Sequence, residues 1–475
     1  MAQAVGGTPG PEFRSVVCVD AIATTDPVNH LRCLSRARVE RSTNASIGPG
    51  TYGRLFPDLP SFSAEQESLF ALGRAGGLCD CGDEADAPAS LASVAAGWPF
   101  FGQFVAHDIS ADRSAPQAHA YVSQLRNARS PRLNLEGLYG DGPIGHPFLF
   151  QRDDPAKLLT APGGRDLLRN SEGTAIIGDP RNDSHVIMSQ MHLAFVHAHN
   201  AFVERARASG EPETHVFTAA ARELVWHYQT VVLREFLPTL IGAALTDLIM
   251  RGDRRYYRPN DQAFIPLEFA DAAYRYGHGQ IRHTYELNSG GRAVPIFPDL
   301  LGFRPVPVEH HIEWPRLFDA AGVPPAARAK KIDGRLVGAL IALPVAVTGV
   351  SEVEEFHSLA VRDLMRGQGV GLPSGEAVAR RMGEPPLSAE EVGAYSTKWS
   401  GETPLWYYIL READVRQGGD RLGPVGSRIV GEVLIGLLDL DPASVRHAPQ
   451  SWTPSATLID LLTGVDRLQL VNHDV

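Results

Sequence analysis

The chain has 475 residues, of which 44% are hydrophobic, and its 44 Lys and Arg against 55 Asp and Glu give a formal net charge of −11. This length allows a large core within one to three domains. No basic tract rises out of the acidic background, which argues against nucleic acid or an anionic membrane as the main partner. The longest apolar run, residues 336–347, is too short to cross a bilayer and contains Pro344, so we expect no transmembrane segment.

The N-terminus and the cysteines bear on the expected compartment. The opening MAQAVGGTPGPEFRS has no charged leader followed by an apolar stretch, so we expect a cytoplasmic protein, with signal-independent export as the alternative. The four cysteines, Cys18, Cys33, Cys79 and Cys81, are then expected to be reduced thiols. The CDC at 79–81 is not a CxxC pair, which leaves a metal or redox site there as a minor alternative.

The composition changes at about residue 90. Residues 1–90 are rich in Gly, Pro and Ser but carry aromatic residues, and we expect an irregular arm that packs on a larger body. Residues 91–475 are expected to form one mainly α-helical domain with few short strands and long irregular connections, which often build a site. Apolar periodicity indicates helices at about 184–208, 216–248, 267–283 and 424–439.

The segment FGQFVAHDIS, residues 101–110, is predicted to be a helix with polar groups on two faces. Gln103 and His107 are spaced i, i+4, so their side chains share one face and can enter one cavity. Asp108 is rotated by about 100° and points elsewhere. The alternative is a core helix with a hydrogen-bonded histidine and a capping aspartate.

A second polar segment, GDPRNDSHVIMSQMH, covers residues 178–192. A Gly-Asp-Pro turn opens the predicted helix and places Arg181 at its start. In the functional interpretation this guanidinium faces a ligand. In the alternative it forms an ion pair with Asp179 or Asp183.

A third segment, AYRYGHGQ, covers residues 273–280 and sets His278 between two glycines. The missing side chains on both sides let a flat, bulky group approach the imidazole. The alternative is a helix break with an incidental histidine. Glycines also recur at 365–373 and 419–433, where they suit tight helix packing.

These motifs, in this order over about residues 95–445, resemble those of the animal-type haem peroxidases of the peroxidase–cyclooxygenase superfamily. The resemblance implies a mainly α fold that holds a b-type haem between two helices. His107, Gln103 and Arg181 match the family's distal residues, and His278 matches the proximal iron ligand. The resemblance implies that His107 moves a proton between the peroxide oxygens while Arg181 stabilises the departing oxygen. Small phenolic, anilinic or halide reductants are the expected electron donors.

The resemblance also implies a calcium site beside the distal histidine. Asp108 matches one ligand, and the loop at 130–140 matches the others. The ligands expected from this loop are Ser130, the carbonyl of Arg132, Asn134 and Glu136. Many relatives carry Asp where this chain has Asn134, which implies a weaker or empty site. Calcium would hold the distal helix against a distant loop.

Departures from the family pattern change the expected chemistry. Vertebrate members bind haem through esters at two positions that are Ala106 and Ser184 here, and neither can form such an ester. We therefore expect non-covalent haem. Asp183 could substitute only if the backbone shifts. His185 is expected to be a pocket residue of unknown role.

The proximal side also departs from the family. Fatty-acid dioxygenases of the superfamily carry a Tyr three residues before the proximal histidine, and that position here is Arg275. This favours a peroxidase, and Arg275 could pair with a haem propionate or form a surface ion pair. The residue that orients His278 is expected near Glu402 or Thr403, with a solvated Glu402 as the alternative. We assign no role to His192, His197, His199, His310 or His311.

Two further functions stay open at this point. One is a fatty-acid dioxygenase-like haem oxygenase, and the other is a haem-binding or adhesion module with little turnover. Retention of the three predicted distal residues argues against the second, because packing alone does not require them. The sequence names neither the physiological reductant nor the oligomeric state.

Overall fold

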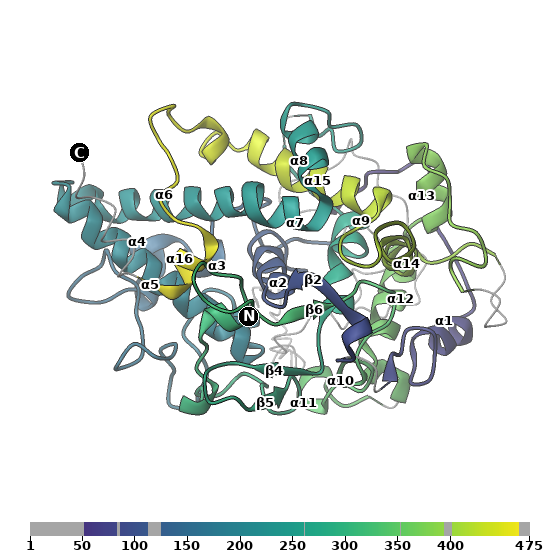
Figure 1. The fold of residues 1–475 in the computed structure, drawn as a ribbon. Helices are drawn as coiled ribbons and strands as arrows, with labels where there is room; N and C mark the ends of the chain where they lie inside the picture. The colour runs from purple at the N-terminus through teal and green to yellow at the C-terminus, as the bar shows by residue number, and fades with distance from the viewer. Residues whose placement is uncertain are drawn as a thin grey trace, which may run out of the picture.

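The computed structural model describes residues 52–82, 86–112, 125–260, 262–351, 353–393 and 401–464. Within these residues helices dominate, and the strands form three sheets of two strands each (Figure 1). The mainly α prediction is therefore confirmed. Cys18 and Cys33 lie outside the described residues.

The helices are α1 (Gln66–Gly73), α2 (Trp98–Ile109), α3 (Glu136–Tyr139), α4 (Gly142–Gly145), α5 (Val186–Ala208), α6 (Glu213–Val231), α7 (Leu237–Ile241), α8 (Ala243–Met250), α9 (Leu267–Ala270), α10 (Gly338–Ile341), α11 (Val345–Thr348), α12 (Leu359–Gly369), α13 (Gly375–Met382), α14 (Leu405–Gln417), α15 (Pro424–Leu440) and α16 (Leu458–Thr463). The strands are β1 (Tyr52–Gly53), β2 (Leu91–Ala95), β3 (Ile265–Pro266), β4 (Thr284–Glu286), β5 (Ala293–Pro295) and β6 (Arg328–Lys330). β1 pairs with β3 in parallel, whereas β2 with β6 and β4 with β5 are antiparallel.

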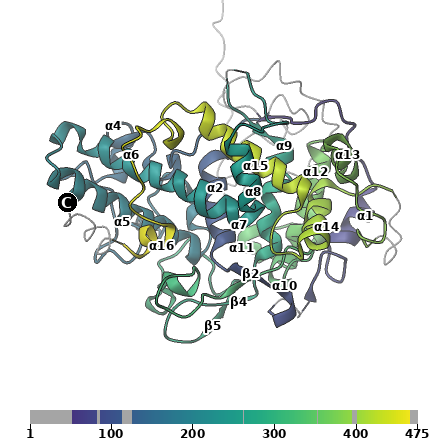
Figure 2. The same cartoon turned by 45° about the horizontal axis from the view of Figure 1, so that its top comes forward.

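Helix α2 lies near the middle of the molecule in two views, with α5 and α6 beside it (Figures 1 and 2). Its apolar stripe enters a cluster of aromatic rings. Phe104 stacks on Phe195 of α5 at 4.7 Å, and Phe101 meets Tyr228 of α6 edge-on at 6.1 Å. This packing fixes the rotation of α2 about its axis and hence the direction of its polar face.

The predictions at 184–208 and 424–439 are confirmed by α5 and α15. The single helix predicted at 216–248 is wrong, because a π-helical turn at Val232–Phe236 and a break at Gly242 (φ +86°) divide it. Pro238 explains the wide turn, since its ring clashes with the carbonyl four residues earlier and its nitrogen cannot donate. Gly242 adopts a backbone conformation that side chains disfavour.

The helix predicted at 267–283 is also wrong. α9 ends at Ala270, and a 3-10 helix follows at Ala273–Gln280. Two glycines flank His278 in this stretch, and glycine is a poor α-helix former. The 3-10 segment packs between α2 and α14, which carries His278 towards the polar face of α2.

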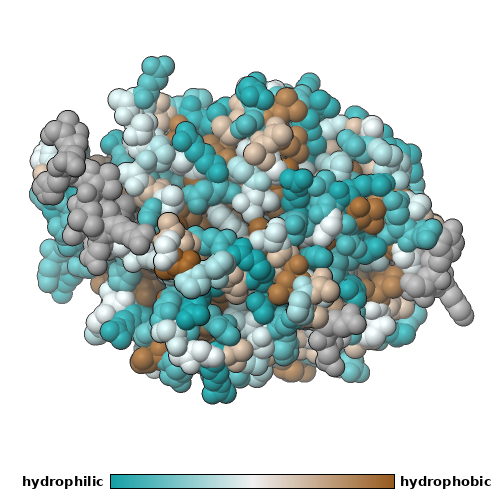
Figure 3. All heavy atoms as spheres, in the orientation of Figure 1, coloured by the Kyte–Doolittle hydropathy of each residue, from teal (hydrophilic) through white to brown (hydrophobic). Residues whose placement is uncertain are grey.

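The described part of the N-terminal arm packs on the helical body. The Glu268 carboxylate accepts the backbone N–H groups of Leu55 and Phe56, and α1 packs against α12. The domain boundary near residue 90 stays a prediction. None of the described helices is long and apolar enough to cross a membrane. On the face drawn in Figure 3, hydrophobic residues are scattered among hydrophilic ones.

Candidate functional site

A cavity lies between α2 and the 3-10 segment that carries His278. It brings together five residues singled out from the sequence: Gln103, His107, Arg181, Arg275 and His278. Its other walls are mainly apolar and come from segments far apart in the chain. These lining residues include Pro99, Phe100, Phe269, Ile296, Phe297, Leu340, Leu343 and Val347.

His107 is buried and held through one ring nitrogen. Its Nδ1–H donates to Oδ1 of Asn182 at 2.8 Å, and the amide nitrogen of Asn182 donates to Nδ1 of His192 at 3.0 Å. The nitrogen Nε2 of His107 therefore carries the lone pair. Burial, with a smaller contribution from the Arg181 cation, lowers the pKa of His107 to about 3. The ring is thus a neutral imidazole in one tautomer.

Arg181 lines the cavity, but most of its donors are used within the protein. Its guanidinium forms two hydrogen bonds with Asp179, at 3.0 and 2.7 Å, and donates to the carbonyls of His107 and Ser110 at 2.9 and 2.8 Å. A guanidinium has five N–H donors, so one remains for a ligand. Arg181 therefore forms the expected ion pair with Asp179 and also lines the cavity.

Gln103 is oriented by His185, whose role the sequence left open. His185 is the N-cap of α5, and its Nδ1 accepts the backbone N–H of Met188 at 3.4 Å. Its Nε2–H therefore donates to Oε1 of Gln103 at 3.0 Å, and the amide NH2 of Gln103 stays available to the cavity. Burial lowers the pKa of His185 to about 3, so this ring is also neutral.

His278, on the other side of the cavity, is held by a residue that the sequence analysis missed. Its Nδ1 lies 2.5 Å from Oδ2 of Asp363, a fully buried carboxylate on α12. The other oxygen of Asp363 accepts from Arg275 at 2.8 Å. Arg275 also donates to Asp271 at 3.0 Å, so it pairs with two carboxylates of the protein. Arg275 also lines the cavity, and its pairing with a haem propionate stays a prediction.

The expectation that Glu402 or Thr403 orients His278 is wrong. Glu402 is 44% exposed at its side chain and bonds Ser374 and Arg380, while Thr403 bonds Glu376. Asp363 lies just before the glycine-rich stretch at 365–373, which we interpreted only as a packing motif. An acidic residue among the buried residues of α12 was the available signal.

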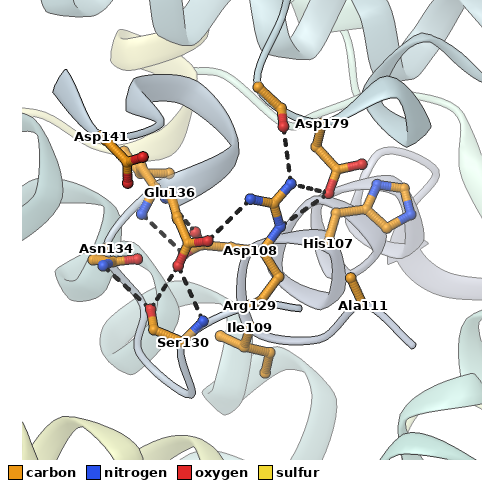
Figure 4. A network of polar contacts seen from close by, with 12 residues as sticks. His107, Asp108, Ile109, Ala111, Arg129, Ser130, Asn134, Glu136, Asp141 and Asp179 are labelled. Atoms are coloured by element: carbon orange, nitrogen blue, oxygen red, sulfur yellow. Dashed lines mark hydrogen bonds and ion pairs between the residues drawn. The ribbon is translucent and has the colours of Figure 1, made fainter. Parts of the chain in front are cut away.

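Four of the five predicted calcium residues, Asp108, Ser130, Asn134 and Glu136, lie in one polar network (Figure 4). Asp108 accepts the backbone N–H groups of Leu135 and Glu136 at 3.0 and 2.8 Å, so α2 is bound directly to the loop. The carboxylate of Glu136 accepts from Ser130 Oγ at 2.8 Å, and Asn134 Nδ2 lies 3.4 Å from the same hydroxyl. Burial raises the pKa of Asp108 to about 7.

Arg129 joins this network to Arg181. Its guanidinium contacts Glu136 at 3.1 Å and Asp179 at 2.5 Å, and donates to the carbonyl of Gly178 at 3.0 Å (Figure 4). Asp179 therefore sits between two arginines. Although burial opposes ionisation, these two cations hold the pKa of Asp179 well below its usual range.

Two observations test whether a haem fits the cavity. Ala106 and Ser184, the two positions compared above with ester-forming residues, both line the cavity. The hydroxyls of Ser184 and Tyr274 are buried without a hydrogen-bond partner, and both residues line the cavity. Buried polar groups are normally paired, so these atoms indicate a missing polar ligand. An apolar cavity lined by two imidazoles and such hydroxyls fits a haem with polar edges.

His197 and His199, which received no role from the sequence, have structural contacts, and the two cysteines at 79–81 are buried. His197 bonds the carbonyl of Gly164, and His199 bonds Tyr139 and the carbonyl of Ala156. Cys79 and Cys81 are buried free thiols, and burial raises the pKa of Cys81 to about 11. No group of three or more His, Cys, Asp or Glu able to hold a metal occurs among the described residues.

The chain is similar to known peroxidases in sequence and in structure. Residues 116–300 match the family model for animal haem peroxidase. Peroxidase mlt-7 of Caenorhabditis elegans is 31% identical over 114 residues, which cover 23% of this chain and 15% of that protein. Chorion peroxidase of Aedes aegypti is 30% identical over 112 residues, 22% of this chain and 14% of that protein. These matches thus span less than a fifth of the relatives' own length.

Solved structures extend the likeness over most of the fold. Peroxidase A from Dictyostelium discoideum has a TM-score of 0.61 at 15% identity, covering 83% of this chain and 88% of that one. The Oryza sativa fatty acid alpha-dioxygenase has a TM-score of 0.57 at 14% identity, covering 90% and 84%. Residues 116–300 are therefore similar to the animal haem peroxidase domain, and the wider chain shares the fold of these solved structures.

Proposed function

We propose that this protein is a haem peroxidase that reduces hydrogen peroxide and oxidises small organic or halide reductants. The observation that carries the proposal is the pair of histidines, His107 and His278, that line one apolar cavity. Each donates from Nδ1 to a buried partner, which leaves Nε2 as the lone-pair nitrogen. Nε2 of His278 suits an iron ligand, and Nε2 of His107 suits a proton acceptor.

A b-type haem would be held by His278 and by the apolar walls, without a covalent bond to Ala106 or Ser184. Its iron would supply the electron chemistry when bound. The unpartnered hydroxyls of Ser184 and Tyr274 are available to polar groups of the haem or of a substrate.

The residues on the α2 side would handle the proton and the charge. His107 is neutral and has a fixed tautomer, so it can accept a proton from bound peroxide at Nε2 and return it to the leaving oxygen. Arg181 stays protonated and has one N–H left to stabilise negative charge on that oxygen. Gln103, fixed by His185, offers its amide N–H groups to peroxide or water.

The proposal includes a calcium ion bound between α2 and the loop at 130–140. Carboxylate, amide, hydroxyl and carbonyl oxygens suit this hard cation, and Oδ1 of Asn134 is buried without a hydrogen-bond partner. The residues that would hold the ion are Asp108, Ser130, Arg132, Asn134 and Glu136. The carboxylates of Asp108 and Glu136 already accept N–H donors, so we expect weak binding that reinforces an existing clamp.

A fatty-acid dioxygenase is the second candidate, and the Tyr274 hydroxyl favours it because it is the phenol that lines the cavity without a partner. Oxygen uptake with an unsaturated or saturated fatty acid, abolished by Tyr274→Phe, would support this reading. Against it, the residue three before His278 is Arg275, which is paired with two carboxylates.

The test is an absorption spectrum of purified protein supplied with haem, before and after one equivalent of hydrogen peroxide. We expect a Soret band that shifts with peroxide and returns when a phenol is added. His107→Ala is expected to keep the Soret band and to react much more slowly. A wild-type protein without a Soret band, or a His107→Ala variant with unchanged peroxide reactivity, would contradict the proposal.

A further inference from the structure

Arg129 does not line the cavity, yet it contacts the same carboxylate as Arg181, which does. We propose that Arg129 is a positioning residue for Arg181: it shares the charge of Asp179, so that Arg181 presents a positive charge to the cavity. The inference rests on the proposed function and deepens it, because it concerns how Arg181 can stabilise the departing oxygen of peroxide.

The carboxylate of Asp179 accepts hydrogen bonds from both arginines. Arg129 donates to Oδ2 from Nε at 3.1 Å and from Nη2 at 2.5 Å, and Arg181 donates to the same oxygen from Nη2 at 2.7 Å. Oδ1 accepts the Nε–H and the backbone N–H of Arg181, each at 3.0 Å. Both oxygens are thus occupied, and the carboxylate is fully buried. Its plane is fixed, and this plane orients the guanidinium of Arg181.

The charges of these three side chains do not cancel. Two guanidiniums and one carboxylate leave one positive charge in excess, and all three groups are largely withdrawn from water. Without Arg129, Asp179 and Arg181 would form a neutral pair, and the carboxylate would offset most of the potential of Arg181. Charges in a buried site act on one another more strongly than charges in water. The excess charge lies at the cavity because Arg181 lines it.

Glu136 offsets the charge of Arg129 only in part. Nη1 of Arg129 donates to Oε1 of Glu136 at 3.1 Å (Figure 4). The side chain of Glu136 is 24% exposed, whereas that of Asp179 is 0% exposed. Water therefore screens the charge of Glu136 more effectively than that of Asp179. The cluster that faces the cavity stays positive.

Both arginines are fixed to the end of α2. Oδ1 of Asn127 accepts the backbone N–H groups of Arg129 and Ala111, at 3.1 and 2.8 Å, and its Nδ2 donates to the carbonyl of Ile109 at 2.9 Å. The guanidinium of Arg181 donates to backbone carbonyls at the same end of this helix. Arg129 is thus held at a constant position relative to Arg181, as a positioning role requires.

The experiment uses the haem-loaded ferrous protein with carbon monoxide bound, and compares wild type with Arg129→Gln. The C–O stretching frequency falls as the potential beside the bound ligand becomes more positive, and carbon monoxide takes up no proton. We expect Arg129→Gln to move the stretch to higher frequency, in the same direction as Arg181→Gln. The rate constant with peroxide is expected to fall about 10-fold, less than on removal of a stabilising donor itself.

Arg169→Gln is the matched control. Arg169 is as buried as Arg129, and it donates to the buried carboxylate of Asp183 at 2.6 and 2.8 Å. This variant also removes a buried cation beside an aspartate of the same segment, but that aspartate is not the partner of Arg181. The control should keep the wild-type stretch. A shift as large as that of Arg129→Gln would indicate general loosening of the segment and would overturn the inference.

Further outcomes separate this inference from the proposed function. If wild type binds no haem, or if Arg181→Gln leaves the stretch unchanged, the proposed role of Arg181 itself fails. If Arg181→Gln shifts the stretch and Arg129→Gln does not, only the present inference is overturned. Should Arg129→Gln fail to fold, Arg129→Lys is the substitute, because lysine replaces the fork of donors by a single ammonium. It should shift the stretch upwards by less than Arg181→Gln, and an unshifted stretch would again overturn the inference.

Discussion

Asn182 and His107 are joined by a hydrogen bond of 2.8 Å from the ring Nδ1–H to the amide oxygen. Because the same amide donates to His192, its orientation is fixed from both ends. His192 received no role from the sequence, yet it determines which atom of Asn182 faces His107. The lone pair of His107 at Nε2 follows from this chain of three side chains.

Removal of the Asn182 amide should therefore change the tautomer of His107 without altering a residue that lines the cavity. We expect Asn182→Ala to lower the rate constant for reaction with peroxide by at least about 10-fold, since the ring can then adopt the other tautomer. Stopped-flow absorbance at the Soret band measures it. Asn200 lies on α5, and its side chain bonds the backbone of Leu158. Asn200→Ala is therefore a control that should keep the wild-type rate constant.

The pH dependence of stability should report His185. Its pKa is about 3 in the folded protein and about 6.5 in the unfolded chain, so between these values the unfolded state binds more protons. Stability is therefore lost as pH falls from 6.5 towards 3, by about 1.4 kcal/mol per pH unit for one such group. We expect the free energy of unfolding of His185→Gln to change less with pH than that of wild type, by about 1.4 kcal/mol per pH unit. Urea unfolding at pH 4.5, 5.5 and 6.5 measures it. An unchanged slope would contradict the neutral, buried ring.

Arg129 should matter more than a surface arginine. It is 7% exposed and supports the fully buried Asp179, so Arg129→Met leaves a buried charge with fewer partners. We expect a loss of about 3 kcal/mol in the free energy of unfolding. The matched control is Arg74→Met, because Arg74 is 49% exposed and pairs with exposed Glu67. That variant should lose no more than about 0.5 kcal/mol.

Calcium binding should depend on residue 134. We expect calcium to raise the melting temperature of the protein, and a chelator to reverse the rise. Asn134→Asp, which adds a carboxylate to the set, should lower the calcium concentration needed for half of the effect. Ser451→Asp, at an exposed position outside the loop, should not change that concentration. If calcium changes the melting temperature of neither wild type nor Asn134→Asp, the proposed calcium site is contradicted.

The sequence predicts well what depends on local spacing. The i, i+4 relation of Gln103 and His107 and the different direction of Asp108 follow from helix geometry, and the structure has both. The division of the helix predicted at 216–248 also had a local signal, because Pro238 and Gly242 both disfavour a continuous α-helix.

The partner of His278 could not be predicted in this way. Asp363 is 85 residues further along the chain, and only the packing of α12 behind the 3-10 segment brings the two together. Glu402 was chosen by its expected distance along the chain, which insertions in long connections easily shift. The pairing of Arg275 with Asp271 and Asp363 depends on the same packing, so the sequence could suggest a propionate partner but not exclude these carboxylates.

The π-helical turn at Val232–Phe236 limits which deletions this helix can accept. A turn of this kind carries one extra residue, so it sets the angular phase of every side chain after it. Phe236 meets Phe101 of α2 at 5.5 Å and Tyr274 at 6.4 Å across that turn. Deleting a single residue here would swing Phe236 away from both rings by roughly 100°. The length of this helix is therefore tied to the alignment of both cavity walls.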